Sequence, residues 1–127
     1  MSTLPSVMVV DDEEELALLF MELLKGSGFN SVSFTDPLLA LNHFRTDPAL
    51  YSLVLTDLRM PEINGVDLAK NIREYSSKVK ILLITAFDDI ENLNADELKE
   101  ANITNVLKKP VKLTELRAQV NKLCINC

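Results

Sequence analysis

The sequence contains little of what several large classes of protein need. Its three glycines form no glycine-rich loop, which leaves neither a P-loop nor a dinucleotide-binding fingerprint. A single histidine makes a Ser-His-Asp or Cys-His catalytic site implausible. No apolar run approaches the roughly 20 residues of a membrane span. A net charge of −6 offers no basic face for phosphates. We therefore expect neither membrane insertion nor direct nucleic-acid binding.

Cysteine is equally scarce, with Cys124 and Cys127 as a single CxxC pair. Such a pair can be redox-active or supply half of a zinc site. Here it follows a predicted helix, and the chain has one histidine as a further zinc ligand, so we interpret both cysteines as incidental. Residues 1–6 lack the basic start and long apolar stretch of a signal peptide. We expect a cytoplasmic location.

Hydrophobic residues are abundant, at 47% of a chain of 127 residues, which suffices for one domain with a substantial core. Apolar strand-like segments alternate with segments whose apolar residues recur at helical spacing. The predicted strands are residues 7–10, 29–34, 53–56, 81–84 and 105–108. Strands that alternate with helices predict a parallel sheet covered on both faces, and right-handed crossovers make it doubly wound. The sequence thus predicts one α/β domain over residues 1–127, with five strands and five helices.

The fourth predicted helix has two possible starts. Asp88 with Glu91 forms one capping box, and Asn94 with Glu97 forms another. Asn102 is a plausible left-handed residue at the end of the same helix. Both starts remain open from the sequence alone.

Polar side chains end four of the predicted strands. Asp11 and Asp12 follow the first strand, Asp57 the third, Thr85 the fourth and Lys109 the fifth. Ligands of open α/β sheets bind at the carboxyl ends of the strands, so we expect these side chains to lie together. Three carboxylates in one crevice repel one another, and a divalent cation and a lysine would relieve that repulsion. Oxygen ligands favour Mg²⁺, Mn²⁺ or Ca²⁺ over zinc.

Asp57 is the most informative of these residues. Asn64 is the more natural cap of the helix that follows, which leaves the Asp57 carboxylate available for other chemistry. Mg²⁺ commonly combines one or two carboxylates with a phosphate, so the cluster suggests a site that awaits a phosphoryl group. Asp57 is then a possible nucleophile that forms an acyl phosphate. Phosphoryl transfer mainly needs positioning and charge neutralisation, which Mg²⁺, Lys109 and a hydroxyl would supply.

Taken together, these motifs resemble the receiver domain of two-component response regulators. The resemblance covers nearly the whole chain, with the motifs in the family's order and near its spacing. The matching elements are Asp11-Asp12, the block from Asp57 to Pro61 with Gly65, Thr85-Ala86 and Lys109-Pro110. The resemblance implies a flavodoxin-like sheet of strand order 2-1-3-4-5. It also raises the expectation of a cis Lys109-Pro110 peptide bond.

The resemblance implies a role for each matching position. Asp57 would accept a phosphoryl group from the histidine of a sensor kinase or from a phosphotransfer protein. Asp12 and Asp57 would bind Mg²⁺ through their carboxylates, with Asp11 bound directly or through water. The backbone carbonyl of Arg59 would be a further ligand. Lys109 would pair with the phosphoryl oxygens.

Three further positions bear on signalling. Thr85 would hydrogen-bond the phosphoryl group and alter the surface of the fourth helix, fifth strand and fifth helix, to which a downstream protein effector would bind. The family usually has Tyr or Phe three residues before Lys109, where this chain has Val106, so the usual aromatic switch is missing. Arg59 and Phe87 would flank the phosphoryl group and slow its hydrolysis; an unchanged half-life after replacing both by small polar residues would refute this. We expect a monomer or weak dimer.

Three functions compete. The first is a phosphorylatable signalling switch, which is no enzyme beyond its Mg²⁺-dependent self-phosphorylation and self-dephosphorylation. The second is a phosphatase of the haloacid dehalogenase type, which needs a second acid where Arg59 stands. The third is a receiver-like binding module that works without phosphorylation, which Val106 keeps open. Steady turnover of a phosphate ester would favour the second function, and failure to take up an acyl phosphate would favour the third.

Overall fold

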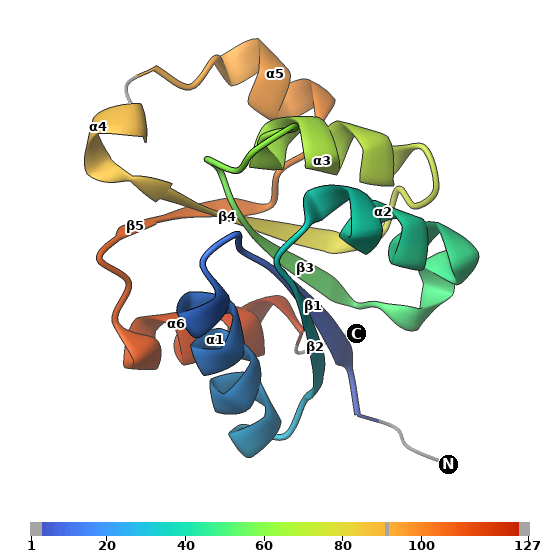
Figure 1. Cartoon of the computed structure of the whole chain (residues 1–127), viewed down its shortest axis with the longest axis vertical. Helices are drawn as coiled ribbons and strands as arrows, with labels where there is room; N and C mark the ends of the chain where they lie inside the picture. Colours follow the sequence, from blue (N-terminus) through green and yellow to red (C-terminus); the bar gives the residue numbers. More distant parts are fainter. Residues whose placement is uncertain (1–3, 91, 125–127) are drawn as a thin grey trace.

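The computed structural model describes residues 4–90 and 92–124 and consists of a sheet with helices on both faces (Figure 1). Within these ranges, parallel strands pair in the order β2-β1-β3-β4-β5. The strands are β1 (Ser6–Val10), β2 (Asn30–Phe34), β3 (Leu53–Asp57), β4 (Lys80–Ala86) and β5 (Asn105–Lys109). The predicted doubly wound α/β fold and its strand order 2-1-3-4-5 are therefore confirmed.

Several helices begin directly after residues that the sequence predicts as caps. They are α1 (Glu14–Gly26), α2 (Pro37–Thr46), α3 (Gly65–Arg73), α4 (Phe87–Ile90), α5 (Ala95–Glu100) and α6 (Leu113–Leu123), with the 3-10 helix η1 (Pro48–Leu50). Asp36 caps α2 by accepting a hydrogen bond from the Leu38 N–H, and Asn64 caps α3 by accepting one from the Asp67 N–H. In the part of the chain that is described, no helix is both long and apolar enough to cross a bilayer.

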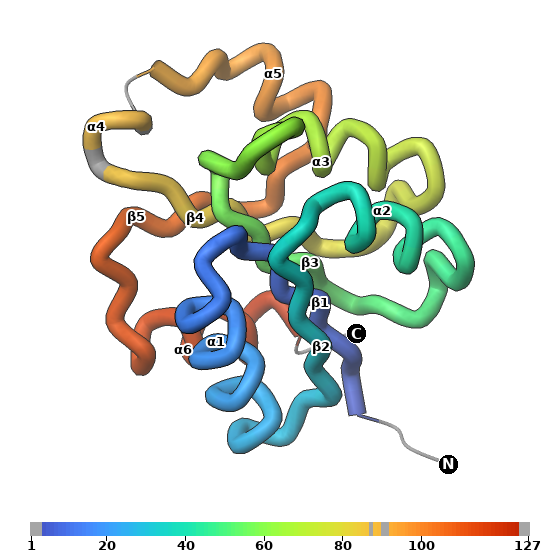
Figure 2. The backbone as a smooth tube through the Cα atoms, in the orientation of Figure 1, coloured from blue at the N-terminus to red at the C-terminus, as the bar shows by residue number. Residues whose placement is uncertain are grey.

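The predicted fourth helix comprises two short helices, α4 and α5. Counted as one segment, they complete the five predicted helical segments with α1, α2, α3 and α6 among the described residues. Asn94 caps α5, and its Oδ1 accepts a hydrogen bond from the Asp96 N–H at 2.8 Å. The later of the two predicted starts is therefore a true helix start, whereas Glu91 of the earlier one lies outside the described residues. Asn102, with a φ of 50°, follows α5 in the predicted left-handed conformation. Figure 2 shows α4 at the end of β4, whereas α5 lies beside α3.

Two hydrophobic layers hold the sheet between its helices. One face is covered by α1 and α6, and the other by α2, α3 and α5 (Figure 1). Every residue of the central strand β3 is buried. Burial of a side chain the size of leucine stabilises by about 1.5–3 kcal/mol, so β3 is firmly anchored. Asp57, its last residue, consequently has a fixed position. Cys124 belongs to the layer under α1 and α6, and Cys127 lies outside the described residues.

Arg73 connects the end of α3 to the end of α5. Its guanidinium donates hydrogen bonds to the carbonyls of Ala101 at 3.0 Å and Asn102 at 2.7 Å. It also donates to the carbonyls of Ser76 at 3.2 Å and Val79 at 2.7 Å. The last carbonyls of a helix have no partner within the helix, so this cation satisfies groups at the end of α5. Burial lowers the pKa of Arg73 below its usual value.

Replacing Arg73 with alanine is expected to lower the free energy of unfolding by about 1.5 kcal/mol, because hydrogen bonds to a charged group are lost from partly buried carbonyls. Urea unfolding followed by circular dichroism measures the loss. The matched control is Arg45→Ala on α2, where the exposed guanidinium contacts Asn42. This control is expected to change stability by less than about 0.5 kcal/mol. Equal effects of the two substitutions would contradict the connecting role of Arg73.

Candidate functional site

The acidic residues that follow β1 lie beside the end of β3. The register pairs Val10 with Thr56, which places Asp11 next to Asp57 across the two strands. Carboxylate oxygens of Asp11, Asp12 and Asp57 lie within 4.8 Å of one another. Asp11 and Asp57 are buried, and Asp12 is exposed. The structure therefore brings together the three carboxylates that the sequence placed at the ends of the first and third strands.

The carboxylate of Asp11 is only half satisfied. Its Oδ1 accepts a hydrogen bond from the Glu13 N–H at 2.9 Å. Its Oδ2 is buried and has no hydrogen-bond partner among the described residues. Leaving a buried acceptor unpaired is costly, and burial raises the pKa of Asp11 to about 6. A buried, unpaired oxygen beside two further carboxylates is a donor set that fits a hard divalent cation.

Lys109 reaches the same cluster from the end of β5. Its Nζ lies 3.2 Å from Oδ1 of Asp57, which also accepts a hydrogen bond from the Leu58 N–H at 3.0 Å. Burial raises the pKa of Asp57, although Lys109 and the Leu58 N–H act in the opposite direction. Burial would lower the pKa of Lys109, but the attraction and hydrogen bond of Asp57, together with the attraction of Asp11 and Glu13, outweigh it. The pKa therefore lies above its usual value. Lys109 thus stays charged beside Asp57, and its peptide bond to Pro110 is cis as expected.

Thr85 lies near the carboxyl end of β4, whereas Val106 is the second residue of β5 and pairs with Leu83. Thr85 is buried, and its hydroxyl makes a long contact of 3.5 Å with the carbonyl of Ala86. A hydrogen bond of this length is weak, so the hydroxyl is loosely held. Val106 is half-buried and packs against the hydrophobic layer that α3 and α5 cover. The position of the family's usual aromatic residue is therefore filled by a small aliphatic side chain.

Arg59 makes a contact that the sequence did not predict. Its guanidinium binds the carboxylate of Asp89 in α4, with Nε 2.6 Å from Oδ2 and Nη2 2.5 Å from Oδ1. Hydrogen bonds from Arg59 lower the pKa of Asp89. These two residues are 30 positions apart in the chain, so no local pattern indicated the pair. The side chain of Phe87, the other predicted flanking residue, lies outside the described part of the structure.

Gly65 fixes the start of α3 against the end of β3. Its N–H donates a hydrogen bond to the Leu58 carbonyl at 2.8 Å. A Cβ atom at this position would overlap the backbone carbonyl oxygen of Asp57 and lie 2.8 Å from Cδ1 of Leu83. Glycine therefore permits a close approach of two backbone segments directly behind the carboxylate cluster.

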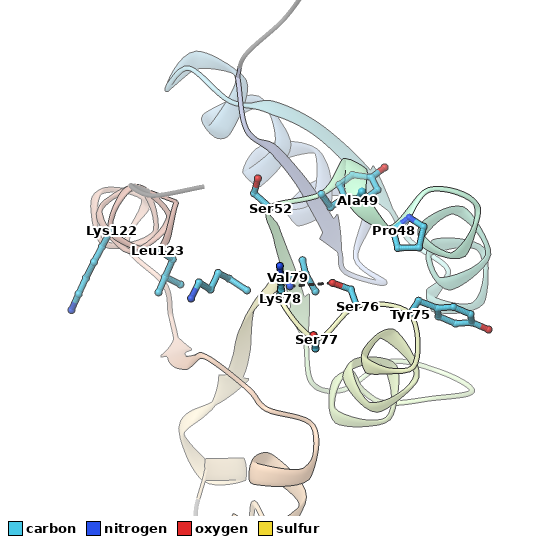
Figure 3. A pocket seen from close by; sticks show the side chains of 12 residues that line it. Pro48, Ala49, Ser52, Tyr75, Ser76, Ser77, Lys78, Val79, Lys122 and Leu123 are labelled. Atoms are coloured by element: carbon cyan, nitrogen blue, oxygen red, sulfur yellow. Dashed lines mark hydrogen bonds between the residues drawn. The ribbon is translucent and has the colours of Figure 1, made fainter.

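A hollow of about 980 Å³ lies at the opposite, amino-terminal edge of the sheet (Figure 3). Its lining comes from η1, the two residues before β3, the segment between α3 and β4 with the first residue of β4, and the end of α6. Lys78, Lys80 and Lys122 belong to this lining, and none of the described residues that line it is acidic. The lining also includes serine and tyrosine side chains. The hollow contains none of the predicted site residues, so the carboxylate cluster is the candidate site.

Known proteins resemble this chain over most of its length. The family model for the response regulator receiver domain matches residues 7–121. The response regulator receiver protein CpdR of Brucella abortus is 28% identical over 120 residues, covering 94% of this chain and 96% of CpdR. The sensory transduction protein RegX3 of Mycobacterium tuberculosis is 36% identical over 116 residues, which are 91% of this chain and 48% of RegX3. The chain thus spans nearly all of CpdR and about half of RegX3.

A solved structure agrees at the level of the fold. The chemotaxis protein CheY4 of Vibrio cholerae superposes with a TM-score of 0.84, covering 95% of this chain and 99% of CheY4 at 23% identity. The match to the family model begins in β1 and ends within α6, and so includes every strand of the sheet. This protein therefore belongs to the family of response regulator receiver domains.

Proposed function

We propose that this protein is a phosphorylatable signalling switch in which Asp57 accepts a phosphoryl group. Receiver domains are signalling domains and not classical enzymes. The observation that carries the proposal is the position of the Asp57 carboxylate, with two other carboxylates on one side and Lys109 Nζ at 3.2 Å. Phosphorylation would change the state of the protein instead of turning over a substrate.

In the proposed reaction, a carboxylate oxygen of Asp57 attacks the phosphorus atom of a phospho-donor. A new O–P bond forms while the bond between phosphorus and the donor breaks. Acetyl phosphate would release acetate, and a phosphohistidine of a sensor kinase or phosphotransfer protein would release an imidazole that keeps or takes up a proton. Lys109 would stabilise the negative charge on the phosphoryl oxygens. The product is an aspartyl phosphate.

A magnesium ion fits the residues at this edge, and receiver domains typically bind one. The carboxylates of Asp11, Asp12 and Asp57 and the backbone carbonyl of Arg59 would hold it. When bound, the ion supplies positive charge that offsets the charge of the phosphoryl group. The unpaired Oδ2 of Asp11 is the observation that supports this assignment. The contribution of the chain itself is to fix three acids on two neighbouring strands.

The output of the switch would pass through Thr85. Its loosely held hydroxyl would hydrogen-bond the phosphoryl group and alter the surface formed by α4, α5, β5 and α6, where a downstream protein effector would bind. Val106, in place of the aromatic residue, keeps one alternative open, a binding module that works without phosphorylation. The two functions differ in whether Asp57 takes up phosphate.

Intact-mass measurement after incubation with Mg²⁺ and acetyl phosphate tests the proposal. We expect a gain of about 80 Da, one phosphoryl group, that requires Mg²⁺ and disappears in Asp57→Ala. The matched control Asp96→Ala removes an exposed aspartate of α5 and is expected to keep the gain. No gain in the native protein, with its circular dichroism spectrum intact, would overturn the switch in favour of the binding module.

A further inference from the structure

Arg59 and Asp89 form a direct connection between the segment after Asp57 and helix α4. Arg59 follows Asp57 by two positions, and Asp89 lies in α4. Nε and Nη2 of the guanidinium each donate to a different oxygen of the same carboxylate, at 2.6 and 2.5 Å. This bidentate arrangement is the strongest geometry of an arginine–carboxylate pair. The pair therefore holds α4 to the end of β3.

The position of α4 depends on this pair. The helix has four residues, which is too short to be stable without tertiary contacts. It contacts the ends of β4 and β5. Of its two neighbouring acids, Asp88 is exposed, whereas Asp89 is only 7% exposed. A buried carboxylate needs a partner of opposite charge, and Arg59 is that partner.

Arg59 is also suited to leave this partner. Its side chain is 78% exposed, so its rotation would give up little buried surface. A phosphoryl group on Asp57 would carry nearly two negative charges and three acceptor oxygens two positions away in the chain. A guanidinium binds phosphate in the same bidentate manner as it binds a carboxylate. The phosphoryl group and Asp89 would therefore compete for one cation.

We propose that the Arg59–Asp89 pair is a latch that holds α4 in the unphosphorylated protein and opens when Asp57 is phosphorylated. Arg59 moves to the phosphoryl oxygens, and Asp89 is left as a buried charge without a partner. Helix α4 then shifts to return Asp89 to water. The latch rests on the proposed phosphorylation of Asp57. It would connect the phosphoryl group to α4 without the aromatic residue that Val106 replaces.

Hydrogen–deuterium exchange of the α4 backbone amides tests the latch, with Asp89→Asn as the key variant and Asp88→Asn as the matched control. In the native protein, treatment with Mg²⁺ and acetyl phosphate should speed exchange in α4 about tenfold, as expected when a charge-assisted contact opens. Asp89→Asn should show this faster exchange without the phospho-donor and change little when the donor is added. Asp88→Asn should behave like the native protein.

A second variant, Arg59→Lys, keeps the positive charge and loses the bidentate geometry, and it should also speed exchange in α4. Native-like slow exchange in both Asp89→Asn and Arg59→Lys would overturn the latch. Unchanged α4 exchange in a native protein that has gained one phosphoryl group would overturn it as well. If acetyl phosphate adds no phosphoryl group to the native protein, the proposed function itself is refuted. Fast exchange in the variants would then show that Arg59 anchors α4, but the latch would not respond to phosphorylation.

Discussion

Replacing Gly65 with alanine is expected to lower the free energy of unfolding by about 2–4 kcal/mol. The new Cβ would overlap the backbone carbonyl of Asp57, and neither backbone segment can easily move. Asp57 ends a fully buried strand, and Gly65 is tied to Leu58 by a hydrogen bond of 2.8 Å. Alanine is the better helix former by up to about 1 kcal/mol in a helix interior, so the measured loss is a lower bound on the cost of the overlap. Urea unfolding followed by circular dichroism measures it.

The matched control for Gly65→Ala is Gly26→Ala, at the end of α1. A Cβ on Gly26 would meet nothing within 4 Å among the described residues. This substitution is expected to leave stability unchanged or to raise it by up to about 1 kcal/mol. Phosphate uptake from acetyl phosphate should also slow in Gly65→Ala and not in Gly26→Ala, because only the first displaces Asp57. A stable Gly65→Ala protein would mean that α3 can move away from the end of β3.

Replacing Asp11 with asparagine is expected to raise the free energy of unfolding by about 3 kcal/mol at pH 8 without Mg²⁺. Burial raises the pKa of Asp11 from 3.8 to about 6, so the folded protein binds its proton more tightly than the unfolded chain does. Protonated Asp11 therefore favours folding, and this stabilisation is lost as the pH rises from about 4 to about 6. Above that range the native protein carries the full penalty of the buried charge, and asparagine removes it.

Unfolding free energies measured between pH 4 and pH 8 test this prediction. The gain from Asp11→Asn should grow between about pH 4 and pH 6 and stay constant above, in line with the raised pKa. The matched control Asp12→Asn changes an exposed carboxylate and should alter stability by less than about 0.5 kcal/mol. Added Mg²⁺ should stabilise the native protein and thereby reduce the difference in unfolding free energy between the native protein and Asp11→Asn. A gain that is independent of pH would exclude a buried charge as its cause.

The sequence predicted the elements of this fold where local chemistry decides them. Runs such as Ile81–Ile84 are apolar on both faces because parallel strands are covered on both sides. Caps such as Asp36 act within one turn, so the residue alone indicates the helix start. The fourth helical segment was ambiguous because two capping boxes compete there, and tertiary contacts decide the outcome. Local signals thus predicted the individual strands and helices, whereas the order of the strands in the sheet was predicted from the family resemblance alone.

Some contacts of the candidate site were predictable from the sequence, and others were not. Fold topology made the meeting of Asp11 and Asp57 predictable, because both end neighbouring strands. The pairing of Arg59 with Asp89 was not predictable, since it depends on where a short helix lies after 30 intervening residues. The approach of Gly65 to the Asp57 carbonyl was also hidden, because an Asn-Gly pair indicates a turn and not what lies behind it. The roles of these residues in phosphorylation remain predictions.

The two edges of the sheet differ in local charge, because lysines line the amino-terminal hollow and a carboxylate cluster lies at the carboxyl edge. Lys78, Lys80 and Lys122 line the amino-terminal hollow, and Asp11 and Asp57 lie at the carboxyl edge. A partner with a positive surface that diffuses toward this protein would be turned toward the acidic edge before the two molecules touch. Raising the salt concentration would shorten the reach of that field and slow the encounter. The charge of the carboxylate cluster would thereby influence how fast such a partner reaches Asp57.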